Sequence, residues 1–324
     1  MADYNKKIIS IIVPIYNEQE IINEFYRRLK AVLDNDLSGY GYEIIYINDG
    51  SKDNSLELLL KLRSNDQNIK IINFSRNFGH QLAVTAGIDS SIGDIVVLID
   101  SDLQDPPELI PKMIEKWNDG FQVVYGQRIK RKGESIFKLA TAKIFYRMIN
   151  ALSDVKLPVD TGDFRLMDKQ VVDYLKQLRE ECRYIRGLVT WVGYKQTPIY
   201  YERDKRYSGE TKYPIRKMIK FATNGLTSFS ERPLFFAGYF GLIITLLTFI
   251  YVGFLIVEKF VSPHNTITGW TSLIIAVLFF GGVQLMSLGI IGQYIGRIYR
   301  EIKNRPLYVI NGKFGFNGEK HINE

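Results

Sequence analysis

Residues 94–108 read DIVVLIDSDLQDPPE, and they give the clearest indication of how this chain folds. After Asp94, five apolar and mostly β-branched residues are typical of a strand that is covered on both faces. Two aspartates separated by one residue follow at once, and Pro106-Pro107-Glu108 then favours the start of a helix over 106–118. The stretch predicts a buried strand, a polar loop and a helix in succession.

Four other segments resemble this strand: IISIIV (8–13), YEIIYI (42–47), IKIINF (69–74) and FQVVYG (121–126). Helical stretches at 18–34 and 53–64 lie between them. Alternating strands and helices predict an α/β domain with a doubly wound, mostly parallel sheet. In such a sheet, ligands bind beyond the carboxyl ends of the strands.

Polar residues concentrate at those predicted strand ends, namely at 14–18, 48–51, 75–80 and 100–104. A single polar loop does not indicate a binding site, because loops are generally polar. Four polar loops on the same edge of a sheet do indicate one. The chain has neither GxGxxG after its first strand nor GxxxxGK[ST] anywhere, so the dinucleotide-binding and P-loop classes lose their main support.

Asp100 and Asp102 end the fourth predicted strand, and Gln104 follows. Two carboxylates with this spacing can converge on Mg²⁺ or Mn²⁺, whose remaining ligands are usually water and phosphate oxygens. Such a metal acts as a Lewis acid on a departing nucleoside diphosphate. The alternative is that the aspartates cap the helix that follows.

Composition narrows the class of protein. The 324 residues carry a net charge of +7, which favours anionic partners. A single cysteine, Cys182, excludes a disulfide framework and a Cys-rich zinc site, and is expected to be a small buried side chain. The apolar run 8–13 is short and ends at Pro14, so we expect no signal peptide and a cytoplasmic location for most of the chain.

Two long uncharged apolar runs, Pro233–Val257 and Trp270–Gly296, are each long enough to cross a hydrocarbon core of about 30 Å as a helix. A buried core helix is the alternative for either run. Basic residues precede the first run and follow the second, so the positive-inside rule predicts a two-pass protein with both termini in the cytoplasm.

We therefore divide the chain into a cytoplasmic catalytic domain (1–210), an amphipathic juxtamembrane segment (211–232), two transmembrane helices (233–298) and a cytoplasmic tail (299–324). The basic amphipathic segment fits a position in the headgroup layer, and it fits packing on the globular domain equally well.

The motifs VPIYNE (13–18), NDGS (48–51), SRNFGHQLA (75–83) and DSDLQDPPE (100–108) closely resemble the inverting glycosyltransferases of family 2, which have the GT-A fold. Within that family the chain is similar to the polyprenyl-phosphate glycosyltransferases. These include dolichol-phosphate mannosyltransferase and the bacterial bactoprenol glucosyltransferases of the GtrB type, which have the same pair of C-terminal membrane spans.

The resemblance implies a role for particular residues of this chain. Asp163, within TGDFRLMD (161–168), takes the place of the proposed catalytic base, and Asp102 serves both catalysis and the metal. Asn48 departs from the second aspartate of many relatives. The remaining implied residues line the nucleotide-sugar pocket (Pro14, Tyr16, Glu18, Asp49, Arg76, Gln104), hold the metal (Asp100, Asp102, Gln104) or bind the acceptor phosphate (Arg128, Arg131, Arg203, Arg206).

The implied reaction transfers a hexose from a nucleotide sugar, with UDP-glucose favoured, to polyprenyl (undecaprenyl) phosphate with inversion, in a homotetramer that uses Mg²⁺ or Mn²⁺. GDP-mannose or a modified UDP-sugar stays open as the donor. So does a non-catalytic membrane-anchored scaffold that binds nucleotide sugars. Attraction to anionic headgroups is the alternative role for Arg203 and Arg206.

Two other classes fit less well. A processive polysaccharide synthase would carry QxxRW, which the chain lacks. Nucleic-acid binding would account for the positive charge, but that charge clusters beside the apolar runs.

Overall fold

The computed structural model describes residues 6–129, 161–181, 183–202, some residues between 238 and 257, and 269–316. The chain forms two compact units, and one boundary between them falls between Asn304 and Arg305. The first unit contains the α/β sheet together with the strand that follows this boundary. The second contains the long helix α10 (Trp270–Ile302).

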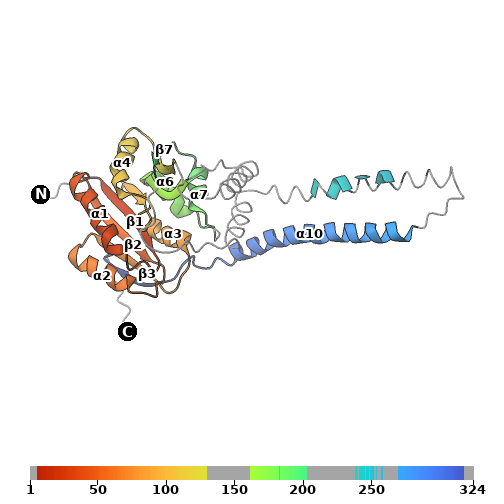
Figure 1. The fold of residues 1–324 in the computed structure, drawn as a ribbon, viewed down its shortest axis with the longest axis horizontal. Helices are drawn as coiled ribbons and strands as arrows, with labels where there is room; N and C mark the ends of the chain where they lie inside the picture. The colour runs from red at the N-terminus through yellow and green to blue at the C-terminus, as the bar shows by residue number, and fades with distance from the viewer. Residues whose placement is uncertain are drawn as a thin grey trace. The chain divides into compact units, whose positions relative to one another are not determined.

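The first unit is built on one eight-stranded sheet in the order β7-β5-β6-β4-β1-β2-β3-β8. Figure 1 shows β1, β2 and β3 side by side in this unit. Neighbours among β4, β1, β2 and β3 are parallel, as are β5 and β7, whereas β6 and β8 run antiparallel to their neighbours. The bounds are β1 Ile8–Ile15, β2 Gly41–Asn48, β3 Ile69–Phe74, β4 Ile95–Leu98, β5 Val123–Arg128, β6 Thr161–Asp168, β7 Gln196–Tyr201 and β8 Ile310–Phe314.

Helices cover both faces of the sheet, which explains the continuously apolar strands. Buried side chains of α1 (Ile22–Asn35), α2 (Ser55–Asn65) and α4 (Ile110–Asn118) form one core with alternate residues of β1 and β2. On the other face, α3 (His80–Ser90) packs against β1 and β2, beside α6 (Lys169–Gln177). Helix α7 (Ile185–Val192) packs on α6.

The structure confirms the predicted α/β class and the five predicted strands, which appear as β1 to β5. The helices predicted at 18–34 and 53–64 appear as α1 and α2. The helix predicted over 106–118 begins as a short 3₁₀ turn, Pro107–Leu109, and continues as α4. The sheet is more mixed than predicted, because β6 and β8 run antiparallel to the strands beside them.

Strand β8 comes from the segment predicted as a tail. It pairs with β3, with Ile71 opposite Phe314 and Phe74 opposite Ile310. Part of the segment 299–324 is therefore an edge strand of the sheet.

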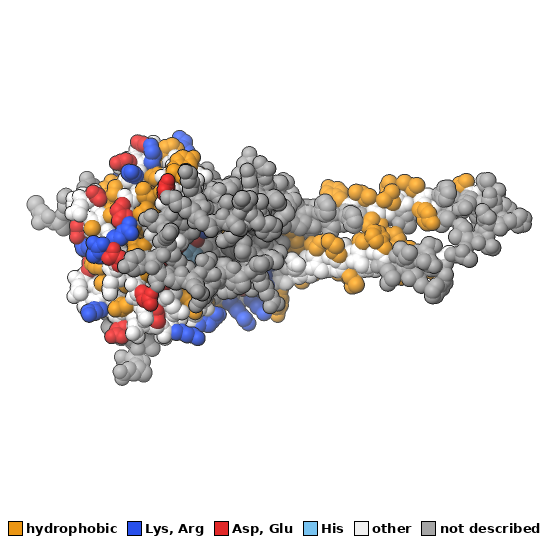
Figure 2. All heavy atoms as spheres, in the orientation of Figure 1, with side chains coloured by type: hydrophobic (Ala, Val, Ile, Leu, Met, Phe, Trp, Pro, Cys, Tyr) orange, Lys and Arg blue, Asp and Glu red, His pale blue; other side chains and the backbone are white. Residues whose placement is uncertain are grey.

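The second unit is represented mainly by α10, a helix of 33 residues. Within the described residues, one stretch is long and apolar enough to cross a membrane, namely Phe279–Ile302, with a mean hydropathy of 1.2. Hydrophobic side chains along α10 are exposed (Figure 2), Leu285 to 72% for example, so a buried core helix does not fit this run. Only scattered residues of the first predicted span, Pro233–Val257, are described, and the juxtamembrane segment (211–232) lies outside the described residues.

Candidate active site

The polar loops predicted at the strand ends lie together at one edge of the sheet, joined by hydrogen bonds. The loop after β1 contacts the loop after β2, where Lys52 N donates to Asn17 Oδ1 at 2.8 Å. It also contacts the loop after β4, where the Ser101 hydroxyl donates to the Glu18 carboxylate. This arrangement is consistent with the prediction that these loops form one site.

Asp49, at the end of β2, holds the loop after β3. Its buried carboxylate accepts hydrogen bonds from Phe78 N at 2.7 Å, Gly79 N at 2.9 Å and Asn77 Nδ2 at 3.0 Å. Burial raises the pKa of this carboxyl group, and the two backbone donors oppose the rise. We call residues 75–79 the donor loop, because Arg76 is one of the predicted nucleotide-binding residues.

Asn48 and Gly50, which flank Asp49 in the sequence, set the shape of the turn after β2. Asn48 donates from Nδ2 to Asn73 Oδ1 at 2.8 Å and so joins the ends of β2 and β3. Gly50 has φ of +64°, and a Cβ atom there would lie 2.4 Å from the carbonyl carbon of Arg76. The turn after β2 and the donor loop therefore pack backbone against backbone.

The loop after β4, residues 100–105, which we call the DSD loop, does not cap a helix. Asp102 Oδ1 accepts from Gln104 N at 3.1 Å, which closes a local turn, and Leu103 has φ of +56°. The 3₁₀ turn that follows begins only at Pro107, and no side chain caps it or α4. The alternative of an N-terminal cap is therefore wrong.

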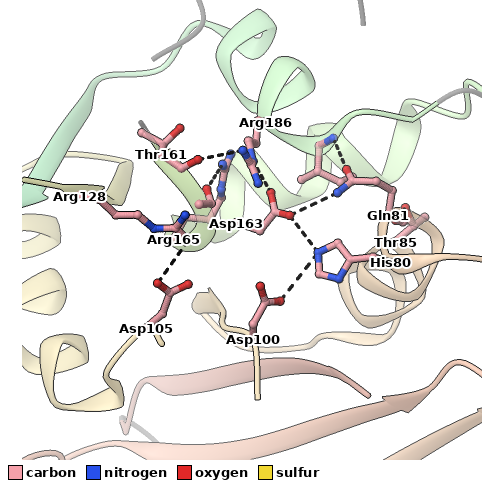
Figure 3. A network of polar contacts seen from close by, with 12 residues as sticks. His80, Gln81, Thr85, Asp100, Asp105, Arg128, Thr161, Asp163, Arg165 and Arg186 are labelled. Carbon is pink, nitrogen blue, oxygen red and sulfur yellow. Dashed lines mark hydrogen bonds and ion pairs between the residues drawn. The ribbon is translucent and has the colours of Figure 1, made fainter. Parts of the chain in front are cut away.

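Asp163 on β6 is the centre of a polar network that spans three elements (Figure 3). Its Oδ1 accepts from Arg186 Nε at 2.6 Å, and its Oδ2 accepts from His80 Nε2 at 2.9 Å and from Gln81 Nε2 at 3.3 Å. Arg186 also donates from Nη1 to Thr161 O at 2.8 Å. The Asp163 side chain is only 6% exposed, and protein groups donate to both of its carboxylate oxygens.

The charges in this network stabilise one another. Burial would raise the pKa of Asp163, but Arg186 and His80 outweigh it and hold that pKa well below its usual range. Burial would lower the pKa of His80, but the Asp100 and Asp163 carboxylates raise it to about 9. At neutral pH the network is thus an ionised carboxylate between two cations.

Gln81 connects this network to α7. Its amide nitrogen contacts Asp163, and its Oε1 accepts from Ile185 N at 2.8 Å, at the first residue of α7. Helices α3 and α7 are thereby fixed relative to β6, and Arg186 on α7 is placed beside the carboxylate.

A second ion pair lies on the other side of the DSD loop. Arg128 Nη2 lies 3.5 Å from the buried Asp105 Oδ1, and the Tyr201 hydroxyl donates to the same carboxylate. A Cβ atom on Gly162 would lie 2.7 Å from Arg128 Nη2, so a glycine lets the guanidinium cross β6 at this point. Arg165 is buried nearby on β6, and burial lowers its pKa to about 10.

The residues around Asp100 fit a divalent cation that is completed by substrate oxygens. The Asp100 side chain is 34% exposed, and its pKa is raised to about 6 by burial and, in spite of His80, by the carboxylates of Asp163, Asp105 and Asp102. Within the described residues, no three His, Cys, Asp or Glu side chains form a group that could hold a metal by themselves. Sites for Mg²⁺ or Mn²⁺ commonly use one or two carboxylates together with phosphate oxygens, and Asp100 and Asp102 are such carboxylates.

Most of the predicted site residues lie in or beside these loops. Pro14 is buried in β1, whereas Tyr16 just after it is 44% exposed. Arg76 lies with its guanidinium carbon 3.9 Å from the centre of the Phe78 ring. Arg131, Arg203 and Arg206 lie outside the described residues.

Four members of the site were not predicted from the sequence, namely His80, Gln81, Asp105 and Arg186. The first three stand inside quoted motifs, so their positions carried a signal. Arg186 stands in no motif and reaches Asp163 only through the packing of α7.

Comparison with known proteins gives a consistent set of relatives. The model of the family described as Glycosyl transferase family 2 matches residues 10–175. An uncharacterised glycosyltransferase, YkcC of Bacillus subtilis, is 51% identical over 96% of this chain and 95% of its own length. The SfII prophage-derived bactoprenol glucosyl transferase of Shigella flexneri is 41% identical over 93% of this chain and 97% of its own length.

Among solved structures, glucosyl-3-phosphoglycerate synthase of Mycobacterium tuberculosis with Mn²⁺, UDP-glucose and phosphoglyceric acid aligns with a TM-score of 0.45 at 16% identity. That alignment covers 67% of this chain and 76% of the other.

Proposed function

Since the chain belongs to glycosyltransferase family 2, we propose that it transfers a hexose from a nucleotide sugar to polyprenyl phosphate at the cytoplasmic face of a membrane, with inversion at the anomeric carbon. The acceptor class is supported by the relatives named bactoprenol glucosyl transferase, which align over nearly their whole length. UDP-glucose is the favoured donor.

One observation carries this proposal: the DSD loop lies between two groups of cations. Asp100 is 3.8 Å from His80 Nε2, within the network of Asp163 and Arg186, while Asp105 pairs with Arg128 (Figure 3). Two anionic substrates must meet at this edge, and guanidinium groups bind phosphate oxygens in a bidentate manner. The arrangement suits a donor diphosphate beside an acceptor phosphate.

The proposed transfer does not require a strong base from the protein. A phosphate monoester has a second pKa of about 6, so the acceptor is largely dianionic at neutral pH and needs no strong base. Asp163 is already ionised and receives protein donors on both oxygens, so its role is to orient Arg186 and His80. Mg²⁺ or Mn²⁺ held by Asp100, Asp102 and Gln104 would supply Lewis-acid stabilisation of the departing diphosphate.

Sheet topology supports the two-pass arrangement. Strand β7 ends at Tyr201 and β8 begins at Ile310, and both belong to one sheet, so the chain between them leaves the domain and returns. A segment with both ends on one side of a membrane crosses it an even number of times. If α10 crosses once, a second crossing must precede it, and the run Pro233–Val257 has the required length.

The experiment is sugar transfer from a panel of radiolabelled nucleotide sugars to undecaprenyl phosphate in detergent. The panel contains UDP-glucose, GDP-mannose and modified UDP-sugars, each with Mg²⁺ or EDTA, and Asp102→Asn is assayed beside the wild type. We expect chloroform-soluble label from UDP-glucose that is lost with EDTA and in the variant. Nucleotide-sugar binding without label in the lipid, for every donor, would instead favour the scaffold.

A further inference from the structure

The donor loop is held from two directions, and only one of them belongs to the loops at the strand ends. Asp49 holds Asn77, Phe78 and Gly79 from the β2 side. From the edge of the sheet, the segment that leads into β8 contacts the beginning of the same loop. Ser75 N donates to Val309 O at 3.0 Å, next to the pairing of Phe74 with Ile310.

Tyr308 extends this contact through a chain of aromatic rings. Its ring stacks on Phe74, with centroids 5.1 Å apart and an interplanar angle of 17°. Phe74 is 2% exposed and meets the Phe78 ring edge-on at 5.6 Å. The Arg76 guanidinium lies over that Phe78 ring at 3.9 Å. Two contacts between aromatic rings and one cation–ring contact thus connect Tyr308 to Arg76, a predicted nucleotide-binding residue.

The Tyr308 ring is fixed at its other end. Its hydroxyl donates to Asp89 Oδ2 at 2.7 Å, near the end of α3, and Arg179 Nη1 donates to the same oxygen at 2.8 Å. A half-buried ring held at both ends supports Phe74 and Phe78 better than a mobile side chain would. Tyr308 therefore ties the donor loop to α3, the helix that begins with His80.

We propose that Tyr308 is a positioning residue for the nucleotide donor, acting through Phe74 and Phe78 on the donor loop. This inference rests on the proposed function, because it takes Arg76 and Asp49 as part of the donor site. Tyr308 follows the second predicted span, so the donor loop has its full support only when the chain has returned to the sheet at β8.

The test compares Tyr308→Leu and Tyr308→Phe in the full chain in detergent, with UDP as the binding probe and the lipid transfer assay for kinetics. Leucine removes the stacked ring, and we expect the Kd of UDP and the KM of the donor to rise about fivefold. The kcat and the KM of the lipid acceptor should stay within about twofold, since Tyr308 touches no reacting group. Phenylalanine keeps the ring, so UDP binding should recover to within about twofold of the wild type.

Val309→Ala is the matched control. The Val309 side chain is 51% exposed, and the backbone carbonyl that Ser75 uses is unchanged, so donor binding should not move. If Tyr308→Leu does not fold, Tyr308→Met takes its place.

An unchanged Kd for UDP in Tyr308→Leu would overturn the inference while leaving the proposed function intact. An equal loss of UDP binding in Tyr308→Leu and Tyr308→Phe, together with a lower kcat in both, would also overturn it. That pattern would indicate a general loss of folding. Failure of the wild type to bind UDP or GDP would instead remove the proposed function, and the inference with it.

Discussion

At the scale of single residues, the central question is what Asp163 does. The family resemblance implies a catalytic base, yet both carboxylate oxygens accept from protein donors and the neighbouring cations keep the pKa low. A carboxylate that binds protons so weakly is a poor general base near neutral pH. It is well suited to hold Arg186 and His80 in place for an anionic substrate.

This assignment predicts that Asp163 and Arg186 act as a unit. We expect Asp163→Asn and Arg186→Gln each to lower kcat about 100-fold, the size of effect seen when an aligned donor to a charged transition state is lost. The double variant should lose little more than either single one, because each change disrupts the same pair. Single-turnover transfer in detergent measures all three.

Arg27→Gln is the control for removing a guanidinium, since Arg27 pairs with Glu24 on the exposed surface and should leave kcat unchanged. Losses that multiply in the double variant would show that Asp163 contributes independently of Arg186, as a base would.

At the scale of elements, the strands were predictable and some of their partners were not. Strands β1 to β4 lie under helices on both faces, so their runs of Ile and Val are readable without tertiary information. Strand β6 carries the buried charges of Asp163 and Arg165, which break that pattern. Strand β8 is a short edge strand whose pairing depends on the chain's return to β3, which no local signal encodes.

In the candidate site as well, some features were predictable from the sequence and others were not. The polar loops after β1 to β4 were predictable, because parallel strands present their carboxyl ends at one edge. The placement of Arg186 was not, because it depends on how α7 packs against α6 and on Gln81. Helix α3 was missed as well: its small residues, such as Ala83, Ala86 and Gly87, give it little amphipathic pattern.

The contact between the turn after β2 and the donor loop predicts a cost for any side chain at position 50. Gly50→Ala should destabilise the domain by about 1–3 kcal/mol, because the residue has positive φ and its new methyl group meets the backbone of Arg76. UDP binding should weaken as well. Thermal unfolding in detergent and a UDP titration measure the two effects.

Gly39→Ala provides the comparison, since a Cβ atom at Gly39 meets nothing within 4 Å. Equal behaviour of the two variants would argue against backbone packing at the donor loop.

At the scale of the whole molecule, the return of the chain to β8 predicts its membrane topology. The sequence has one cysteine, so Cys182→Ser provides a background for single reporter cysteines. We expect a membrane-impermeant maleimide to label Ser262→Cys, between the two predicted spans, in intact cells. Asn317→Cys, beyond β8, should be labelled only after the membrane is opened. Labelling of both positions, or of neither, in intact cells would contradict two crossings.

The identity of the reaction product decides whether the proposed function is correct. The most direct measurement is the mass of the chloroform-soluble lipid formed from unlabelled undecaprenyl phosphate, UDP-glucose and the full chain with Mg²⁺, beside Asp102→Asn. We expect a species heavier than the acceptor by one hexose residue with the wild type, and none with the variant. Hydrolysis of the donor to free sugar and UDP, with the lipid mass unchanged for every donor of the panel, would contradict it.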